Sequence, residues 1–107
     1  MSEEWVRIAD ESDIVDGEPF ASEYRGEAIA LYRFEGTIYA IGDLCTHEQV
    51  RLSDGWFEGD RIECPLHQSC FEIRTGKAIE GGPAYLDVPA YAVKVEDGGV
   101  YVSAASE

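Results

Sequence analysis

Short runs of β-branched and aromatic residues recur along this chain, and glycine or aspartate ends most of them. Residues 28–34 and 37–41 flank Glu35-Gly36, a pattern that predicts a β-hairpin. No window shows the apolar spacing of a helix, and the 11 glycines fit many tight turns. We therefore expect an all-β fold, a small and mostly antiparallel sandwich or barrel. Further strands are expected at residues 5–8, 61–63, 71–73, 92–95 and 100–102.

The length of 107 residues suits one domain, and no repeat or linker divides the chain, so we expect a single domain over residues 1–107. No apolar run reaches the roughly 18 residues of a membrane span, and residues 1–5 lack the features of a signal peptide. These observations predict a cytoplasmic protein without a membrane partner. Three cysteines are too few for a disulfide scaffold, so we interpret them as thiols or metal ligands.

Acidic residues dominate the charge: 22 carboxylates against 8 lysines and arginines give a formal net charge of -14. Such a polyanion does not bind nucleic acid through its phosphates. The surplus is uneven, since residues 1–27 hold nine carboxylates and only two arginines. Two interpretations stay open, namely a solvated face that keeps a small protein soluble, and a docking surface for basic partners.

Both histidines of the chain lie within three residues of a cysteine. The patterns are Cys45-Thr46-His47 and, after sixteen intervening residues, Cys64-Pro65-Leu66-His67. Two thiolates and two imidazoles supply four donors, and loops at one end of a sheet can bring them to one centre. The pairing therefore predicts a metal site. Structural zinc also uses two Cys and two His, although it usually pairs Cys with Cys and His with His.

The mixed Cys-x-His and Cys-Pro-x-His loops closely resemble those of Rieske 2Fe-2S proteins, in which two Cys hold one iron and two His hold the other. The chain is similar in particular to the ferredoxin components of bacterial aromatic-ring-hydroxylating dioxygenases. The resemblance implies a β sandwich with two cluster loops at one tip, one 2Fe-2S cluster, and ligands Cys45, His47, Cys64 and His67. It extends to Trp5, residues 37–40, residues 52–55, Phe71, residues 74–76 and Gly82-Pro83, which resembles a loop that covers the cluster.

The resemblance also implies a reduction potential at the low end of the Rieske range of about -150 to +300 mV. Val50 and Leu66 stand where respiratory-chain Rieske proteins have two additional, disulfide-bonded cysteines. Ser69 keeps a hydroxyl that donates to the cluster sulfurs in those proteins, whereas Phe71 replaces the tyrosine that supplies another. Fewer donors stabilise the reduced cluster less, so the potential is lower.

The chain lacks a dinucleotide-binding loop, a P-loop and a nucleophile elbow, so we predict an electron carrier with no catalytic residue. The resemblance implies electrons taken from an NAD(P)H-dependent flavin reductase and passed to a terminal Rieske oxygenase, in weak encounters by a monomer. Two alternatives stay open: the small Rieske subunit of an assimilatory nitrite reductase, and a structural zinc module. We interpret Cys70 as a partly buried small residue, and Trp5 and Trp56 as core or edge aromatics.

Overall fold

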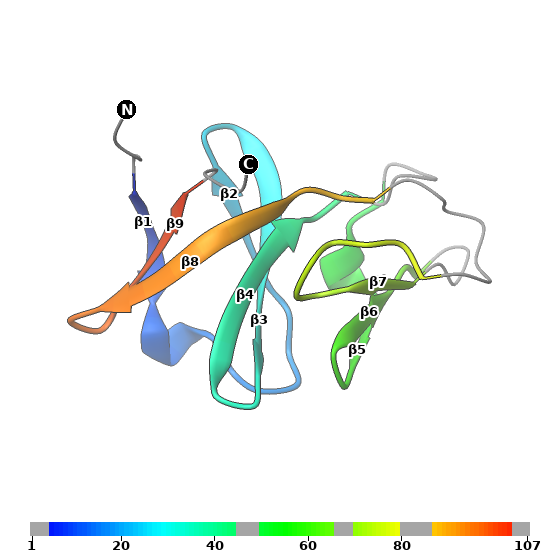
Figure 1. Cartoon of the computed structure of the whole chain (residues 1–107), viewed down its shortest axis with the longest axis horizontal. Helices are drawn as coiled ribbons and strands as arrows, with labels where there is room; N and C mark the ends of the chain where they lie inside the picture. Colours follow the sequence, from blue (N-terminus) through cyan, green and yellow to red (C-terminus); the bar gives the residue numbers. More distant parts are fainter. Residues whose placement is uncertain (1–4, 45–49, 66–69, 80–86, 104–107) are drawn as a thin grey trace.

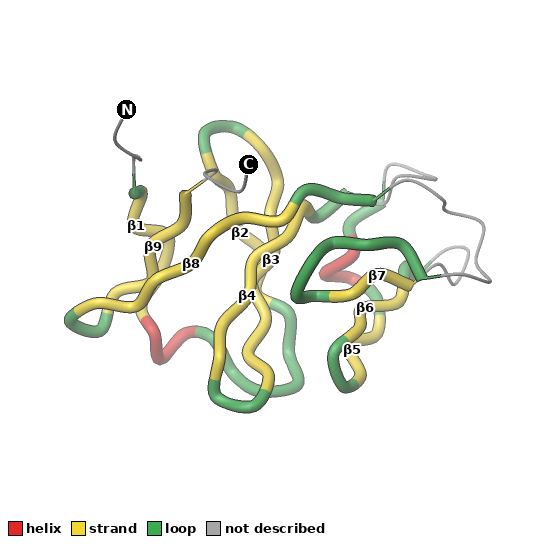
Figure 2. Tube along the Cα trace, in the orientation of Figure 1, coloured by secondary structure: helices red, strands yellow, loops and turns green. Residues whose placement is uncertain are grey.

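The computed structural model describes residues 5–44, 50–65, 70–79 and 87–103. Within these ranges nine strands form two sheets, and the helices are two single 3-10 turns (Figures 1 and 2). The all-β prediction is confirmed. None of the helices described is long or apolar enough to cross a bilayer. The elements are β1 (Val6–Asp10), η1 (Glu11–Asp13), β2 (Phe20–Tyr24), β3 (Glu27–Phe34), β4 (Thr37–Gly42), η2 (Leu52–Asp54), β5 (Trp56–Glu58), β6 (Arg61–Glu63), β7 (Cys70–Glu72), β8 (Ala90–Glu96) and β9 (Gly99–Ser103).

The larger sheet has six strands in the order β1-β9-β8-β4-β3-β2, and the smaller has three in the order β5-β6-β7. All neighbouring strands within both sheets are antiparallel. The predicted hairpin is β3–β4, and its turn places Glu35 and Gly36 at φ of 53° and 81°. Two successive positive φ values are typical of the type I′ turn, whose twist matches that of the flanking strands. Figure 1 shows the smaller sheet beside this hairpin.

Strand β3 is buried on both faces and separates two hydrophobic cores. Because side chains alternate along a strand, Ala30 and Tyr32 face one core while Ile29 and Leu31 face the other. The first core joins β3 to the smaller sheet, where the rings of Tyr32 and Phe57 meet edge to face at 5.0 Å. The smaller sheet is therefore held against the larger one by packing, and the first core includes Cys64.

The structure differs from the expected strands at three places. Strands β2 and β5 were not predicted from the sequence, and the strand expected at residues 71–73 spans Cys70–Glu72. The N–H of Ile73 still donates to the carbonyl of Asp60, at 3.0 Å, in the register of β6 and β7, but Asp60 belongs to the β5–β6 turn, so the paired strand ends at Glu72. The other expected strands are present: the one at residues 61–63 has the expected bounds, and the ends of the rest differ by no more than two residues.

Candidate metal centre

Cys64 is the predicted ligand that the structure describes, whereas Cys45, His47 and His67 lie outside the described residues. Cys64 directly follows β6 and is fully buried. It belongs to the first core, together with Ile62 and Phe71. An apolar shell of this kind limits solvent access to a metal site and so influences its redox potential.

Backbone hydrogen bonds join the chain on either side of the first predicted loop. The N–H of Leu52 donates to the carbonyl of Asp43 at 2.7 Å, and Leu44 forms a β-bridge with Arg51. The segment that contains Cys45 and His47 therefore starts and ends at one point of the fold.

The second predicted loop is closed in the same way by the smaller sheet. Glu63, which precedes Cys64, pairs with Cys70 across β6 and β7. The carbonyl of Cys70 accepts a hydrogen bond from the N–H of Ile79 at 2.8 Å. The segments that contain His67 and the predicted covering loop at Gly82-Pro83 thus depart from adjacent positions, although His67 and Gly82-Pro83 themselves lie outside the described residues.

Gly55, which follows the first predicted loop, lies against Glu63 and Pro65 at the start of the second. A Cβ atom built on Gly55 would lie 1.8 Å from the carbonyl oxygen of Glu63 and 3.1 Å from Cδ of Pro65. No side chain fits in that space, so glycine permits the close approach. This contact places the chain that follows Cys45 and His47 beside the residues on both sides of Cys64.

Asp43 anchors the base of the first loop as a fully buried carboxylate. It accepts hydrogen bonds from the N–H of Ser53 at 2.8 Å and from its hydroxyl at 2.7 Å. Arg51 adds a longer bond from Nη1 at 3.3 Å. Burial raises the pKa of the Asp43 carboxyl, whereas the donors from Ser53 and Arg51 lower it. The three donors compensate much of the cost of burying this group.

Cys70 lies close to Cys64 in the sequence but has a different environment. Its side chain is half-buried, and Cys64 and Cys70 are not joined in a disulfide. Burial raises the pKa of the Cys70 thiol, and the nearby Glu63 carboxylate raises it further. The partial burial expected of Cys70 is confirmed.

Comparison with known proteins identifies the family. Residues 4–92 match the family model of the Rieske [2Fe-2S] domain. The chain belongs to the Rieske [2Fe-2S] family. This assignment confirms the fold and the cofactor class predicted from the two Cys/His loops, and it favours a 2Fe-2S cluster over the zinc alternative.

Curated relatives of the chain include ferredoxin components of dioxygenase systems. The ferredoxin component of the naphthalene 1,2-dioxygenase/salicylate 5-hydroxylase systems of a Ralstonia species is 45% identical over 97 residues, which cover 91% of this chain and 92% of the relative. Proteins of this kind carry electrons and are not themselves catalytic, which agrees with the electron-carrier prediction.

Solved Rieske structures superpose closely. A ferredoxin from Sphingomonas yanoikuyae B1 has a TM-score of 0.87 and 35% identity, covering 94% of this chain and 98% of that one. The ferredoxin of carbazole 1,9a-dioxygenase, solved in complex with its oxygenase, has a TM-score of 0.86 and 33% identity, covering 96% and 95%. A putative nitrite reductase small subunit from Mycobacterium tuberculosis is 18% identical at a TM-score of 0.83, a likeness of fold alone.

The described part of the chain fits a Rieske cluster. Cys64 is a buried thiol at the end of a strand, and the flanks of both predicted ligand loops are joined in one hydrogen-bonded frame. Phe71 is fully buried in the core, where it offers no hydroxyl. Val50 packs against the same core, so an apolar side chain occupies the first of the two positions that respiratory-chain proteins use for a disulfide. Leu66 and Ser69 lie outside the described residues.

Two residues of this Rieske domain take roles that the sequence alone did not reveal, and a third, Trp56, has the edge position that was expected but an exposure that was not. Asp43 and Ser53 form the buried polar base of the first loop, although a carboxylate at a strand end usually indicates only a turn. Trp56 was expected to be a core or edge aromatic. It lies on the edge strand β5 and is 59% exposed. The Leu52-Ser53-Asp54-Gly55-Trp56 run was the available signal for Ser53 and Trp56, since it joins the two ligand loops.

Proposed function

We propose that this protein is the one-electron carrier of an aromatic-ring-hydroxylating oxygenase system. It would take electrons from an NAD(P)H-dependent flavin reductase and deliver them singly to a terminal Rieske non-haem iron oxygenase. The observation that carries the proposal is the 45% identity, over nine-tenths of both chains, to a naphthalene dioxygenase/salicylate 5-hydroxylase ferredoxin component. A single domain over residues 1–107, a monomeric state and a cytoplasmic location are part of the same proposal.

The proposed ligands are Cys45 and Cys64 for one iron and His47 and His67 for the other. A cluster held in this way accepts and releases one electron at a higher potential than a four-cysteine cluster, because imidazoles are neutral where thiolates are negative. The chain contributes a buried Cys64 and two loop bases fixed by hydrogen bonds. Fixed loop bases limit the movement of the ligands between the two redox states, which favours fast transfer.

The nitrite reductase alternative receives less support. Its solved representative shares the fold at 18% identity, whereas the dioxygenase ferredoxins share both the fold and 33–45% of the sequence. A carrier that serves an oxygenase also needs no site for the aromatic compound, because the substrate binds only to the oxygenase.

Two measurements test the proposed function. Purified protein should be reddish brown, hold about two irons and two acid-labile sulfides per chain, and lose visible absorbance with dithionite. Mixed with the reductase and oxygenase of a naphthalene 1,2-dioxygenase system, it should support NAD(P)H-dependent product formation that stops when it is omitted. Colourless protein with one zinc would contradict the cluster, and reduction of nitrite reductase without oxygenase turnover would contradict the partner.

A further inference from the structure

Trp56 is a large aromatic side chain that the fold leaves in solvent. Among the described residues, large hydrophobic side chains are exposed at four positions: Val15, Leu44, Trp56 and Val95. Trp56 is the largest of them and also the most exposed, at 59%. Exposed tryptophan is a common energetic centre of protein interfaces.

The position of Trp56 connects it to the metal centre. In the pairing of β5 with β6, Trp56 lies opposite Glu63, and Glu63 directly precedes Cys64. Leu44 is also exposed and precedes Cys45. Val95, in contrast, lies on β8 next to the β8–β9 turn, at the far end of the long axis from the smaller sheet (Figure 1). A partner that covers Trp56 would therefore be placed beside a proposed ligand of the cluster.

Trp56 borders an open groove of about 470 Å³ along β5. Pro19 and Phe57 also line this groove, and Glu58 and Glu63 supply its charge. Among the described residues that line it, none is cationic. The groove thus combines apolar surface with two carboxylates, a composition that suits a lysine or arginine side chain with an apolar stem and a cationic end.

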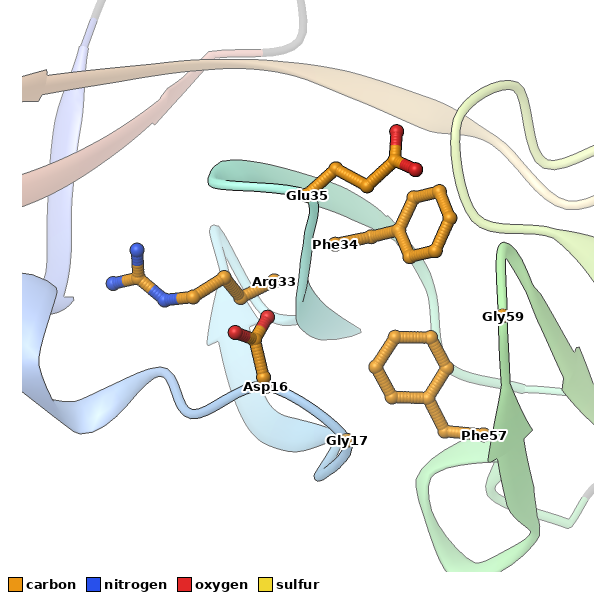
Figure 3. A pocket seen from close by; sticks show the side chains of 7 residues that line it. All are labelled: Asp16, Gly17, Arg33, Phe34, Glu35, Phe57 and Gly59. Atoms are coloured by element: carbon orange, nitrogen blue, oxygen red, sulfur yellow. The ribbon is translucent and has the colours of Figure 1, made fainter.

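A second hollow, of about 260 Å³, continues the groove because both are lined by Gly17 and Phe57. Figure 3 shows the rings of Phe34 and Phe57 turned toward this hollow, with the guanidinium of Arg33 directed away from them. Arg33 instead donates to the carbonyls of Ile14 at 2.7 Å and Glu11 at 2.9 Å. Among the described residues that line the hollow, Arg33 is the one cation; because it is engaged with backbone, the acidic character of the groove is retained.

We propose that the Trp56 groove is the docking site for a basic side chain on the rim of the terminal oxygenase. The inference rests on the proposed function and adds the surface and the chemistry of recognition. The indole face offers a cation–π contact, and the Glu58 carboxylate offers an ion pair at the same point. The chain as a whole carries a net charge of -14, which attracts a basic surface over a longer range. A solved ferredoxin relative forms a complex with its own oxygenase.

The test compares Trp56→Ala and Trp56→Phe with the control Val95→Ala, all as cluster-loaded protein. Dithionite-reduced ferredoxin is mixed in stopped flow with the oxidised oxygenase of the naphthalene 1,2-dioxygenase system, and the Kd comes from the concentration dependence. Trp56→Ala should raise the Kd about tenfold. Trp56→Phe should recover most of that loss, and Val95→Ala should match wild type. The visible spectrum and midpoint potential should stay unchanged in all three.

A charge variant tests the second part of the proposal. Glu58→Gln should weaken binding at low salt and reduce its dependence on ionic strength, whereas the control Glu96→Gln at the far end of β8 should do neither. A Kd for Trp56→Ala within twofold of wild type would overturn the docking site and leave the proposed function intact. If Trp56→Ala raised the Kd for the reductase but not for the oxygenase, the choice of partner would be overturned. Wild-type protein that fails to reduce the oxygenase would overturn both.

Discussion

Ser53 donates two hydrogen bonds to Asp43, one from its backbone N–H to Oδ1 at 2.8 Å and one from its hydroxyl to Oδ2 at 2.7 Å. These two residues lie on opposite sides of the segment that contains Cys45 and His47. The bonds add to the backbone link between Leu52 and Asp43, at 2.7 Å, so three contacts hold the two ends of the loop together. Because Asp43 is fully buried, its carboxylate keeps this position only when donors are present to bond it.

Asp43→Ala should therefore lower the free energy of unfolding by about 3 kcal/mol, because it leaves the Ser53 and Arg51 donors without their buried acceptor. Ser53→Ala should cost less, about 1.5 kcal/mol, since the backbone bond to Asp43 persists. The exposed Asp54 of η2 provides the control, and Asp54→Ala should change the stability by no more than about 0.5 kcal/mol. Denaturant titrations followed by circular dichroism give the three values. Equal losses for Asp43→Ala and Asp54→Ala would contradict the anchoring role.

Gly55→Ala should disrupt the site by sterics alone. The φ of Gly55 is -95°, which any residue adopts, but a Cβ would lie 1.8 Å from the carbonyl oxygen of Glu63. The end of β6 would have to move, and Cys64 would move with it, so iron content should fall well below that of wild type. Gly59→Ala is the matched control, because Gly59 has a φ of +61° with open space around it. That variant should lose about 1 kcal/mol of stability and keep its iron.

Measured iron, sulfide and melting temperature decide between these outcomes. Full cluster loading in Gly55→Ala would show that the approach of the two loops is not required. Loss of iron in Gly59→Ala as well would show that the effect comes from glycine replacement in general and not from the contact with Glu63.

Local sequence patterns predicted the central strands but missed two at the periphery. Strands β3 and β4 were predictable because Glu35-Gly36 separates two runs rich in β-branched and aromatic residues. Strand β2 was missed because its five residues include glutamate and serine, and only their alternation shows the inward face of Phe20, Ser22 and Tyr24. Strand β5 has three residues and depends on its pairing with β6. Tertiary contacts, not propensity, establish such short strands.

In the metal centre, too, local sequence patterns predicted some features, whereas others depend on tertiary contacts. The predicted ligands depend on residue type and spacing, so Cys64 could be proposed from the sequence, and the structure adds its burial. The role of Asp43 depends on its burial and on donors eight to ten residues away, which no local pattern contains. The exposure of Trp56 likewise follows from its place on an edge strand, and edge position is a property of the assembled sheet.

Serine replacements at Cys64 and Cys70 should distinguish the proposed cluster ligand from the cysteine that is not a ligand. Cys64→Ser should abolish the visible absorbance and the bound iron, because a serine hydroxyl is a poor substitute for a thiolate. Cys70→Ser should retain both, since Cys70 is not one of the four proposed ligands and a serine fits in the place of its partly buried side chain. Absorbance spectra and iron analysis of the two purified variants are sufficient. Loss of the cluster in Cys70→Ser but not in Cys64→Ser would reverse the assignment.

Tyr32→Phe tests a buried hydroxyl that has no hydrogen-bond partner among the described residues. Burial, followed by the charge of Asp43, raises the pKa of Tyr32 above its ordinary value. Above about pH 10 the unfolded chain ionises this tyrosine while the folded chain keeps it protonated, so the folded state binds more protons and stability falls as pH rises. The slope from this residue alone approaches about 1.4 kcal/mol per pH unit.

Tyr32→Phe removes both the unpartnered buried hydroxyl and the loss of stability that its raised pKa causes at alkaline pH. At pH 7, where Tyr32 is neutral in both states, Tyr32→Phe should be as stable as wild type or up to about 1 kcal/mol more stable, because no buried group is left without a partner. Between about pH 9 and 11 the variant should lose stability less steeply than wild type. Apparent melting temperatures at a fixed scan rate across this range measure both effects. A variant that melts well below wild type at pH 7 would mean that the hydroxyl makes a stabilising contact, and an unchanged alkaline slope would mean that Tyr32 ionises in the folded state.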